Sequence, residues 1–301
     1  MISIIISSYQ NHYYDQLVAN IKESIGNCAY EVIQVCNPGI MGVAKAYNTG
    51  AKKANYPFLL FVHEDILFKT PNWGDLLVSH LKEKDTGIIG LAGSSYVPCA
   101  PSSWTVSEKY NAVNILQGNK NNKDYTAIRT TVKNKTPVFA VDGVFMAVRK
   151  EHYEQFHFNE KLLSGFHGYD LDFSLRMSGK FRNYVVDDIL IQHFSGGNLD
   201  KTWLDANIKI RRNTPALFQK ERDQETEKEA FSGFLNRFFT YYPVNLKNIL
   251  STFRFYPEKL NFKNHLKIIY IYINYIRYSS DFNKKLNASA ENYQINKSPQ
   301  Q

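Results

Sequence analysis

The sequence predicts an α/β fold in which a mostly parallel sheet is flanked by helices and followed by a helical, basic C-terminal extension. Residues 58–62 form a continuous apolar run, which is typical of a strand buried on both faces of a sheet. Residues 15–25 carry apolar side chains at helical spacing. The excess of positive charge lies in the last third of the chain, where the pattern becomes helical.

The first part of the chain alternates strand and helix patterns. We expect strands at residues 2–7, 30–35 and 58–62, separated by helices at 15–25 and 43–54. This order predicts parallel strands joined by right-handed crossovers.

The middle of the chain is less regular. Residues 94–135 contain prolines, Gly118 and many asparagines and lysines, so we expect a mobile loop there. Beyond this loop we expect a strand, two helices and a further strand that ends at His193, at residues 138–149, 152–158, 169–178 and 183–192.

The composition is that of a soluble globular protein, with 44% hydrophobic and 21% charged residues in 301. Three cysteines at unrelated spacings predict neither a disulfide framework nor a zinc site, and we expect a reducing, cytoplasmic location. Residues 2–6 lack the basic flank and length of a signal peptide. The apolar run at 268–276 has only half of the ~20 residues that a membrane span needs, so we expect no integral membrane segment.

The charge is unevenly distributed. Residues 1–200 carry 19 basic and 19 acidic side chains, whereas residues 201–301 carry 17 and 9. This asymmetry indicates an anionic partner for the last third, either a lipid surface or nucleic acid. We predict a catalytic domain at 1–200, a helical basic extension at 201–287 and a disordered tail at 288–301.

Polar side chains follow the predicted strands, where open α/β sheets bind their ligands. Ser8 follows the first strand, Asn37 the second, and His63, Glu64 and Asp65 the third. Adjacent carboxylates there need a counter-charge, which a hard divalent cation bridging Asp65 to a diphosphate would supply. A solvated acidic turn is the alternative.

Two later segments add candidates. Asp170 and Asp172 stand at the start of a predicted helix, where they can act chemically or merely complement the helix dipole. His193 leaves a strand into a glycine-containing loop, where its imidazole can bind Mn²⁺ or phosphate or can be structural.

Taken in order, these segments resemble the GT-A fold glycosyltransferases of family 2. That family has an apolar first strand ending in a Ser-Ser-Tyr-like sequence, an Asn-containing helix, an Asp-X-Asp-type triplet, an acidic helix start ending in Leu-X-Arg, and a late histidine. The matches are residues 4–9, Asn48 with Gly50, residues 63–65, residues 170–176 and His193. The resemblance covers about residues 1–200.

The resemblance implies a metal-dependent transferase that moves a sugar from a nucleotide-diphosphate sugar to an acceptor hydroxyl, with inversion and with Mn²⁺ or Mg²⁺ as cofactor. It implies that Asp170 is the general base, that Asp65 is a metal ligand and that His193 binds the metal or the diphosphate. The donor-binding residues that it implies, besides Asp65, are Ser8, Asn37, Asn48 and Glu64.

Three positions depart from the family pattern. His63 stands where the triplet usually begins with Asp, and Asn37 stands where an Asp often contacts the base. Tyr169 replaces the Glu that usually precedes the catalytic Asp. The identity of the nucleotide therefore stays open.

The acceptor site is less well defined by the sequence. We predict that Asp142 and Asp172 contribute to it. Trp104 and Trp73 are both candidates to stack on a sugar ring, Trp104 the stronger of the two, and a core position is the alternative for each. We expect a glycan or lipid-linked acceptor in cell-surface polysaccharide synthesis at the inner face of the membrane.

The basic extension contains an amphipathic segment. Lysines and Arg277 alternate there with Phe262, Leu266, Ile269, Ile273 and Ile276, which approximate one helical face. This pattern predicts peripheral contact with an anionic membrane, or else packing of the face on the catalytic domain.

Two other functions compete with sugar transfer. A nucleotidyltransferase of the same sheet type would need a glycine-rich basic loop after the first strand, which residues 7–11 lack. A non-catalytic glycan- or nucleic-acid-binding protein would use the basic tail, but no nucleic-acid recognition motif is present and we expect no nucleic-acid partner.

Overall fold

The computed structural model describes residues 1–119, 122–130, 134–214, 218 and 221–295. Residues Met1–Val97 and Ser107–Phe218 form one compact unit, and Pro98–Val106 with Gln219–Gln301 form a second. The first unit holds the sheets and the second is helical.

The first unit contains thirteen strands and six helices in its described residues. The strands are β1 (Ile2–Ser8), β2 (Tyr30–Cys36), β3 (Phe58–His63), β4 (Ile66–Phe68), β5 (Thr86–Gly90), β6 (Ala92–Ser94), β7 (Asn111–Asn119), β8 (Asn122–Arg129), β9 (Lys135–Val138), β10 (Ala140–Val141), β11 (Phe145–Arg149), β12 (Arg182–Val186) and β13 (Ile191–His193). The α-helices are α1 (Asn11–Ser24), α2 (Val43–Ala51), α3 (Trp73–Leu81), α4 (Lys150–Phe156), α5 (Tyr169–Ser178) and α6 (Lys201–Asn213), and a 3-10 turn spans η2 (Glu108–Tyr110).

A seven-stranded sheet forms the centre of this unit, in the order β2-β1-β3-β11-β5-β12-β9. β1 pairs in parallel with β2 and β3, as expected, because each of these strands is followed by a helix that returns the chain to the same edge. β11 pairs antiparallel with both β3 and β5, and β9 with β12, so five of these seven described strands share one direction.

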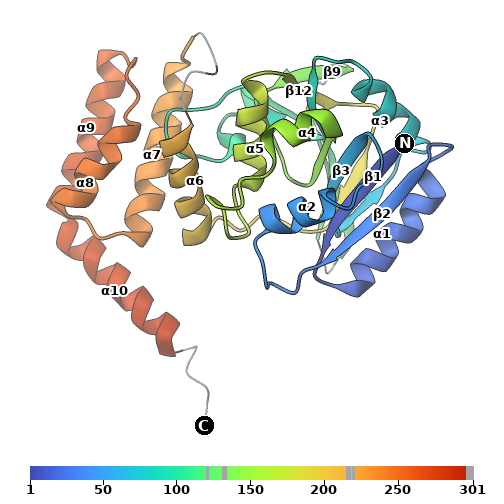
Figure 1. The fold of residues 1–301 in the computed structure, drawn as a ribbon. Helices are drawn as coiled ribbons and strands as arrows, with labels where there is room; N and C mark the ends of the chain where they lie inside the picture. Colours follow the sequence, from blue (N-terminus) through green and yellow to red (C-terminus); the bar gives the residue numbers. More distant parts are fainter. Residues whose placement is uncertain (120–121, 131–133, 215–217, 219–220, 296–301) are drawn as a thin grey trace. The chain divides into compact units, whose positions relative to one another are not determined.

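Helices cover both faces of the large sheet. α2, α4 and α5 share one core cluster with side chains from one face, among them Ile5 of β1 and Phe61 of β3. Alternate strand residues point to the other face, where α1 contacts β1 and α3 contacts β5 and β11. Figure 1 shows α2 beside the blue strands β1 to β3, with α4 and α5 further along the sheet.

A second sheet lies beyond the ends of the first, in the order β10-β6-β7-β13-β4 with β8 paired to β7. The predicted mobile loop at residues 94–135 therefore forms a β-hairpin and two 3-10 turns over its described part. The predicted strand at residues 183–192 is instead two strands, because β12 joins the large sheet and β13 joins the small one.

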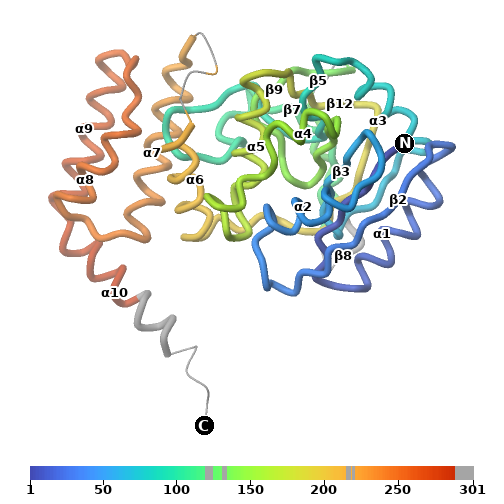
Figure 2. Tube along the Cα trace, in the orientation of Figure 1, coloured from blue at the N-terminus to red at the C-terminus, as the bar shows by residue number. Residues whose placement is uncertain are grey.

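The second unit consists of helices packed through aromatic side chains. Its elements are η1 (Trp104–Val106), α7 (Gln224–Tyr241), α8 (Leu246–Thr252), η3 (Phe253–Phe255), α9 (Phe262–Arg277) and α10 (Ser279–Ile295). Asp223, Asn245 and Asn261 cap α7, α8 and α9 by accepting backbone N–H bonds with their side chains. Figure 2 follows α7, α8 and α9 as neighbouring segments, and α10 contacts α7 and α9.

The boundary between the units falls at 218/219 rather than at the predicted residue 200. α6 belongs to the first unit because its Ala206 and Ile210 pack with Leu163 and Leu175 in one apolar cluster. The tail predicted as disordered from residue 288 begins within α10, and residues 296–301 lie outside the described residues. None of the helices in the described part of the chain has the length and apolar content that crossing a bilayer requires.

Candidate metal centre and active site

Three potential metal ligands meet where the two sheets adjoin. His63 ends β3, Asp65 lies in the turn before β4, and His193 ends β13. Antiparallel pairing of β13 with β4 places His193 opposite Ile66, and the backbone N–H of Phe194 donates to the Asp65 carbonyl at 3.1 Å. One ligand atom from each of the three residues lies within 4.8 Å of the others, an arrangement found at this one place among the described residues.

The distances from Asp65 to the two histidines would allow the three residues to bind one metal ion together. Its Oδ1 lies 3.6 Å from Nε2 of His193 and 4.0 Å from Nδ1 of His63. The carboxylate is only 10% exposed, so an ion there would be largely screened from water by the protein. Two imidazoles and one carboxylate are ligands that a first-row divalent cation accepts, with positions remaining for diphosphate oxygens. The residues present therefore fit such a group.

Gln117 of β7 orients His193. Its Nε2 donates to the Ser195 carbonyl at 2.8 Å and also faces the carbonyls of His193 and Gly118. These carbonyls fix the amide so that Oε1 points to Nδ1 of His193, 3.3 Å away. Because Oε1 can only accept, Nδ1 carries the hydrogen and Nε2 is turned toward Asp65.

Tyr169 orients the imidazole of His63, as Gln117 orients that of His193. Its hydroxyl lies 2.8 Å from His63 Nε2 and 3.4 Å from the Gly143 carbonyl, to which it donates. Burial raises the pKa of Tyr169 well above its usual value, so the phenol stays neutral and can accept from His63. His63 is then a donor at Nε2 and presents Nδ1 to Asp65.

Asp170 follows Tyr169 at the start of α5 and contacts the same glycine. The backbone N–H of Gly143 donates to Asp170 Oδ2 at 3.2 Å. Burial and, secondarily, the nearby Asp142 carboxylate raise the pKa of Asp170 to about 7. A carboxyl group with a pKa near neutrality can take up a proton at physiological pH. Gly143 thus connects the candidate base to the candidate metal centre.

Glu64 holds the ends of two strands together. Its carboxylate accepts the backbone N–H groups of Tyr9 at 2.9 Å and of Gln10 at 3.0 and 3.1 Å, just before α1. The neighbouring Ser8 is buried, and its hydroxyl accepts from Gln34. Both residues lie at the carboxyl edge of the sheet, as the sequence indicates, and their roles in donor binding stay predictions.

The two predicted donor-binding asparagines are bonded within the protein. Asn37 bridges to both the N–H and the carbonyl of Met41, closing the turn after β2. The Asn48 amide donates to Phe158 and Glu160 and accepts from Tyr153 and Phe158, which uses its full capacity. These contacts give Asn48 a structural role in joining α2 to the segment after α4, and its part in donor binding stays a prediction.

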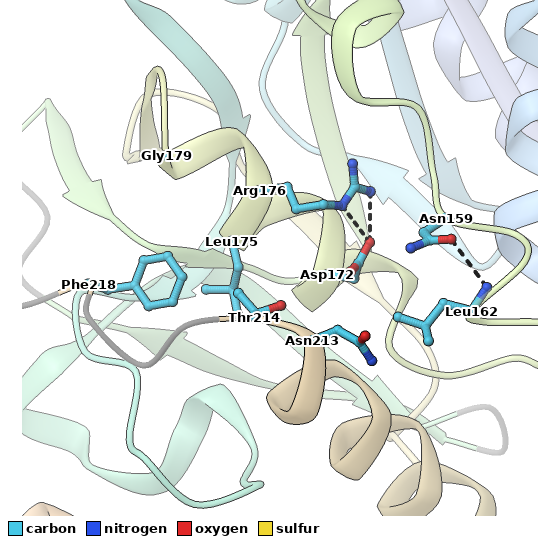
Figure 3. A pocket seen from close by; sticks show the side chains of 9 residues that line it. All are labelled: Asn159, Leu162, Asp172, Leu175, Arg176, Gly179, Asn213, Thr214 and Phe218. Carbon is cyan, nitrogen blue, oxygen red and sulfur yellow. Dashed lines mark hydrogen bonds and ion pairs between the residues drawn. The ribbon is translucent and has the colours of Figure 1, made fainter.

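The predicted acceptor residues do not form one group in the structure. Asp142 accepts from the N–H of Val144 and lies near Asp170. Asp172 instead pairs with Arg176 and lines a different pocket of about 430 Å³ (Figure 3). Trp104 lies in η1 of the second unit, and stacking on a sugar stays a prediction for it.

Trp73 is a core residue. Its side chain is fully buried, stacks on Phe68 at 3.8 Å between ring centroids and donates to Ser24. The suggestion that it stacks on a sugar is therefore wrong, because no face of the indole is accessible.

The predicted site residues omitted three that the structure adds. The sequence places His63 in the polar triplet after the third predicted strand and marks it as a departure from the family pattern, but it does not assign His63 as a metal ligand; its position two residues before Asp65 is a usable signal for that role. Gln117 lies in the segment expected to be a loop, and its strand register is what brings it opposite His193. Tyr169 was also identified only as a departure.

The chain matches a protein-family model described as "Glycosyltransferase like family" over residues 3–230. It belongs to this glycosyltransferase family. The matched range includes His63, Asp65, His193 and Asp170. No curated protein matches the chain in sequence.

Solved structures place the fold among the GT-A glycosyltransferases. S. aureus TarS 1-349 covers 99% of this chain and 93% of that chain, at 14% identity and a TM-score of 0.52. A longer S. aureus TarS structure covers 85% of this chain at 14% identity and a TM-score of 0.50. A structure of GalNAc-T7 with UDP, GalNAc and Mn²⁺ covers 70% of this chain at 11% identity and a TM-score of 0.49. The chain spans about half the length of the last two, 49% and 47%.

Proposed function

We propose that this glycosyltransferase depends on a divalent cation and transfers a sugar from a nucleoside-diphosphate sugar to an acceptor hydroxyl with inversion. His63, Asp65 and His193 hold the cation, and Asp170 is the general base. The observation that carries the proposal is the arrangement of these groups around Tyr169 and Gly143.

Tyr169 and Asp170 are adjacent at the start of α5, and they serve the metal cluster and the acceptor side of the site respectively. Tyr169 bonds to His63, a member of the metal cluster, and Asp170 bonds to Gly143, whose carbonyl Tyr169 also contacts. A displacement at an anomeric carbon needs an activated hydroxyl on one side and a stabilised leaving group on the other. The proximity of a three-ligand cluster to a carboxyl group of raised pKa supplies both requirements.

Asp170 accepts the proton of the acceptor hydroxyl as that oxygen attacks. Its pKa of about 7 makes the carboxylate basic enough to take the proton while leaving much of it ionised near neutral pH. The Gly143 N–H holds Oδ2 in place. One displacement by the acceptor oxygen, with Asp170 as its base, inverts the anomeric centre, as the resemblance to family 2 implies.

The other side of the site binds the diphosphate. A bound divalent cation would supply positive charge that stabilises the departing diphosphate. Asp65 balances part of that charge, while Gln117 and Tyr169 keep the two imidazoles in the ligating orientation. Glu64 and Ser8, at the same sheet edge, support the backbone on which the nucleotide would rest. A cell-surface glycan as product and a cytoplasmic location are further parts of the proposal. The sequence resemblance supports the first, and three cysteines without a disulfide pattern support the second.

The test separates donor binding from transfer. The purified protein is incubated with UDP-, GDP- and dTDP-sugars with Mn²⁺ or EDTA, and thermal stabilisation and sugar hydrolysis are measured. We expect one donor class to stabilise the protein in a cation-dependent way. Asp65→Ala loses this stabilisation, whereas Asp170→Asn keeps it and loses at least ~100-fold in turnover, the typical contribution of a general base.

The exposed Asp15 on α1 provides a matched control. Asp15→Asn removes one exposed carboxylate that has no assigned part in the site and should behave as the wild type. Equal loss of donor binding in Asp65→Ala and Asp170→Asn would contradict the division of roles. Absence of any response to the donors, with or without cation, would overturn the proposed function.

A further inference from the structure

Helix α9 is apolar on two different faces. One face buries Ile268, Tyr272 and Tyr275 within the second unit, where Tyr275 packs against Phe239 of α7. The residues of the other face are exposed by about half or more, and they are Phe262 (77%), Leu266 (48%), Ile269 (48%), Ile273 (52%) and Ile276 (56%). The second face of α9 therefore takes no part in the hydrophobic core of this unit.

The exposed residues form a continuous stripe. They recur at intervals of three and four residues from one end of α9 to the other, and at 3.6 residues per turn they occupy about a quarter of the circumference. A row of five large apolar side chains in water is costly, and contiguous exposed patches of this kind mark interaction sites.

Helix α8 adds a second, shorter row. Leu246, Leu250 and Phe253 at the end of α8 are 71%, 58% and 48% exposed. α8 is joined to α9 through Tyr272, whose hydroxyl bonds to Thr252 at 2.7 Å and whose ring stacks on Phe253. The rows belong to one packed helix pair, which we name the α8–α9 surface.

The charged residues in the segment that forms this surface are mostly basic. Residues 242–280 contain six basic side chains and one acidic side chain, and α9 itself has no acidic residue. Lys263 and Arg277 are exposed at the two ends of α9, on the same side of the apolar stripe. Long basic side chains beside an apolar stripe can extend to phosphates while their carbon chains cover apolar surface.

We propose that the α8–α9 surface docks on an anionic lipid bilayer, with α9 lying in the plane of the interface. The apolar stripe enters the boundary between headgroups and acyl chains, and the basic residues contact lipid phosphates. The 16 residues of α9 would extend over about 24 Å of that interface.

A second copy of the chain fits this surface less well. A symmetric dimer through α9 brings each patch against itself, so the basic residues of the two copies approach one another. No acidic side chain of α9 is available to compensate them. Like charges across an interface are unfavourable, whereas an anionic bilayer satisfies the apolar and the basic parts together.

The test is flotation of the full-length protein with phosphatidylcholine vesicles, either pure or containing 30% phosphatidylglycerol. We expect the protein to float with the anionic vesicles and to bind pure phosphatidylcholine at least ~10-fold more weakly. Ile269→Ser/Ile273→Ser and Lys263→Glu/Arg277→Glu should each reduce binding at least ~10-fold. Far-UV circular dichroism and the melting temperature check that both variants remain folded.

Lys52→Glu/Lys53→Glu is the matched control, because it makes the same charge change on exposed residues of the first unit. We expect it to bind anionic vesicles within about twofold of the wild type. Wild-type protein that stays unbound overturns the proposal, as does a folded Ile269→Ser/Ile273→Ser protein that floats normally. A concentration-dependent dimer that this variant abolishes, without vesicle binding, identifies a second copy as the occupant. These measurements need no sugar donor and are independent of the proposed catalysis.

Discussion

Gln117 and His193 are register partners in the parallel pair of β7 with β13, and their side chains meet at 3.3 Å between Oε1 and Nδ1. The amide is fixed by the Ser195 carbonyl, so the imidazole has its hydrogen on Nδ1. As long as Gln117 keeps this position, His193 presents its unprotonated Nε2 to Asp65. A residue outside the candidate ligand set thus determines which nitrogen a candidate metal ligand presents.

Replacing Gln117 tests this relationship directly. Gln117→Leu keeps a similar size but removes the acceptor for His193 Nδ1, so the imidazole can rotate or change tautomer. We expect the dissociation constant for Mn²⁺ to rise ~10- to 100-fold, the usual effect of losing such a partner. Isothermal titration calorimetry of the donor-free protein measures it. Gln16→Leu, at an exposed position of α1, is the control and should leave the constant unchanged.

The ligand set predicts which cation the enzyme uses. Mg²⁺ prefers oxygen ligands and gives up water reluctantly, whereas first-row cations such as Mn²⁺ accept imidazole. After removal of metal with EDTA, we expect Mn²⁺ to restore activity and equimolar Mg²⁺ to restore less than about a tenth of it. His63→Asp replaces one imidazole by a carboxylate and should raise the Mg²⁺-to-Mn²⁺ activity ratio. Equal activation of the wild type by both cations would contradict the proposed set of ligands.

Gly143 is predicted to be intolerant of a side chain. A Cβ at this position would lie 2.2 Å from the Tyr169 hydroxyl, closer than any contact permits. Gly143→Ala should therefore displace Tyr169 from His63 and shift the N–H that holds Asp170. We expect both Mn²⁺ affinity and turnover to fall at least ~10-fold, as measured by calorimetry and by sugar transfer. Gly233→Ala on α7, where a Cβ would meet no atom within 4 Å, controls for the substitution itself.

The elements predicted best from the sequence are those with a complete local signal. β1 and β3 begin at residues 2 and 58, as their apolar runs indicate, because buried parallel strands are apolar along most of their length. β2 begins at residue 30, where apolar and polar residues alternate. α5 spans Tyr169–Ser178, matching the predicted helix. Asp65 and His193 meet because both follow strands, which the sequence could indicate.

Other parts depend on long-range pairing that no local pattern encodes. β7 and β8 lie in polar sequence and exist as strands through pairing with each other and, for β7, with β13 and β6. The position of Gln117 follows from that register alone. β11 enters the sheet antiparallel between β3 and β5, and the sequence predicts a strand there without its direction. Thus the ligands at strand ends were predictable and the residues that orient them were not.

The raised pKa of Asp170 predicts how activity and stability depend on pH. If Asp170 is the base, kcat/KM should rise about tenfold per pH unit below pH 7 and level off above it, because only the carboxylate accepts the proton. The folded protein also holds this proton more tightly than the unfolded chain, in which an aspartate has a pKa near 3.9. The stability that the protonated form provides is therefore complete below about pH 4 and is lost as the pH rises through 7.

Asp170→Asn removes both effects, since the amide cannot titrate. In EDTA at pH 8, we expect this variant to be more stable to urea than the wild type by about 2 to 4 kcal/mol, and the difference should shrink toward pH 4. Turnover should be low and nearly independent of pH. Asp15→Asn should retain the wild-type profile in both measurements. Two results together would contradict this prediction: wild-type activity that does not change between pH 5 and 8, and unchanged stability in Asp170→Asn. Asp170 would then be ionised over that whole range, because hydrogen bonds to its carboxylate would offset the effect of burial on its pKa.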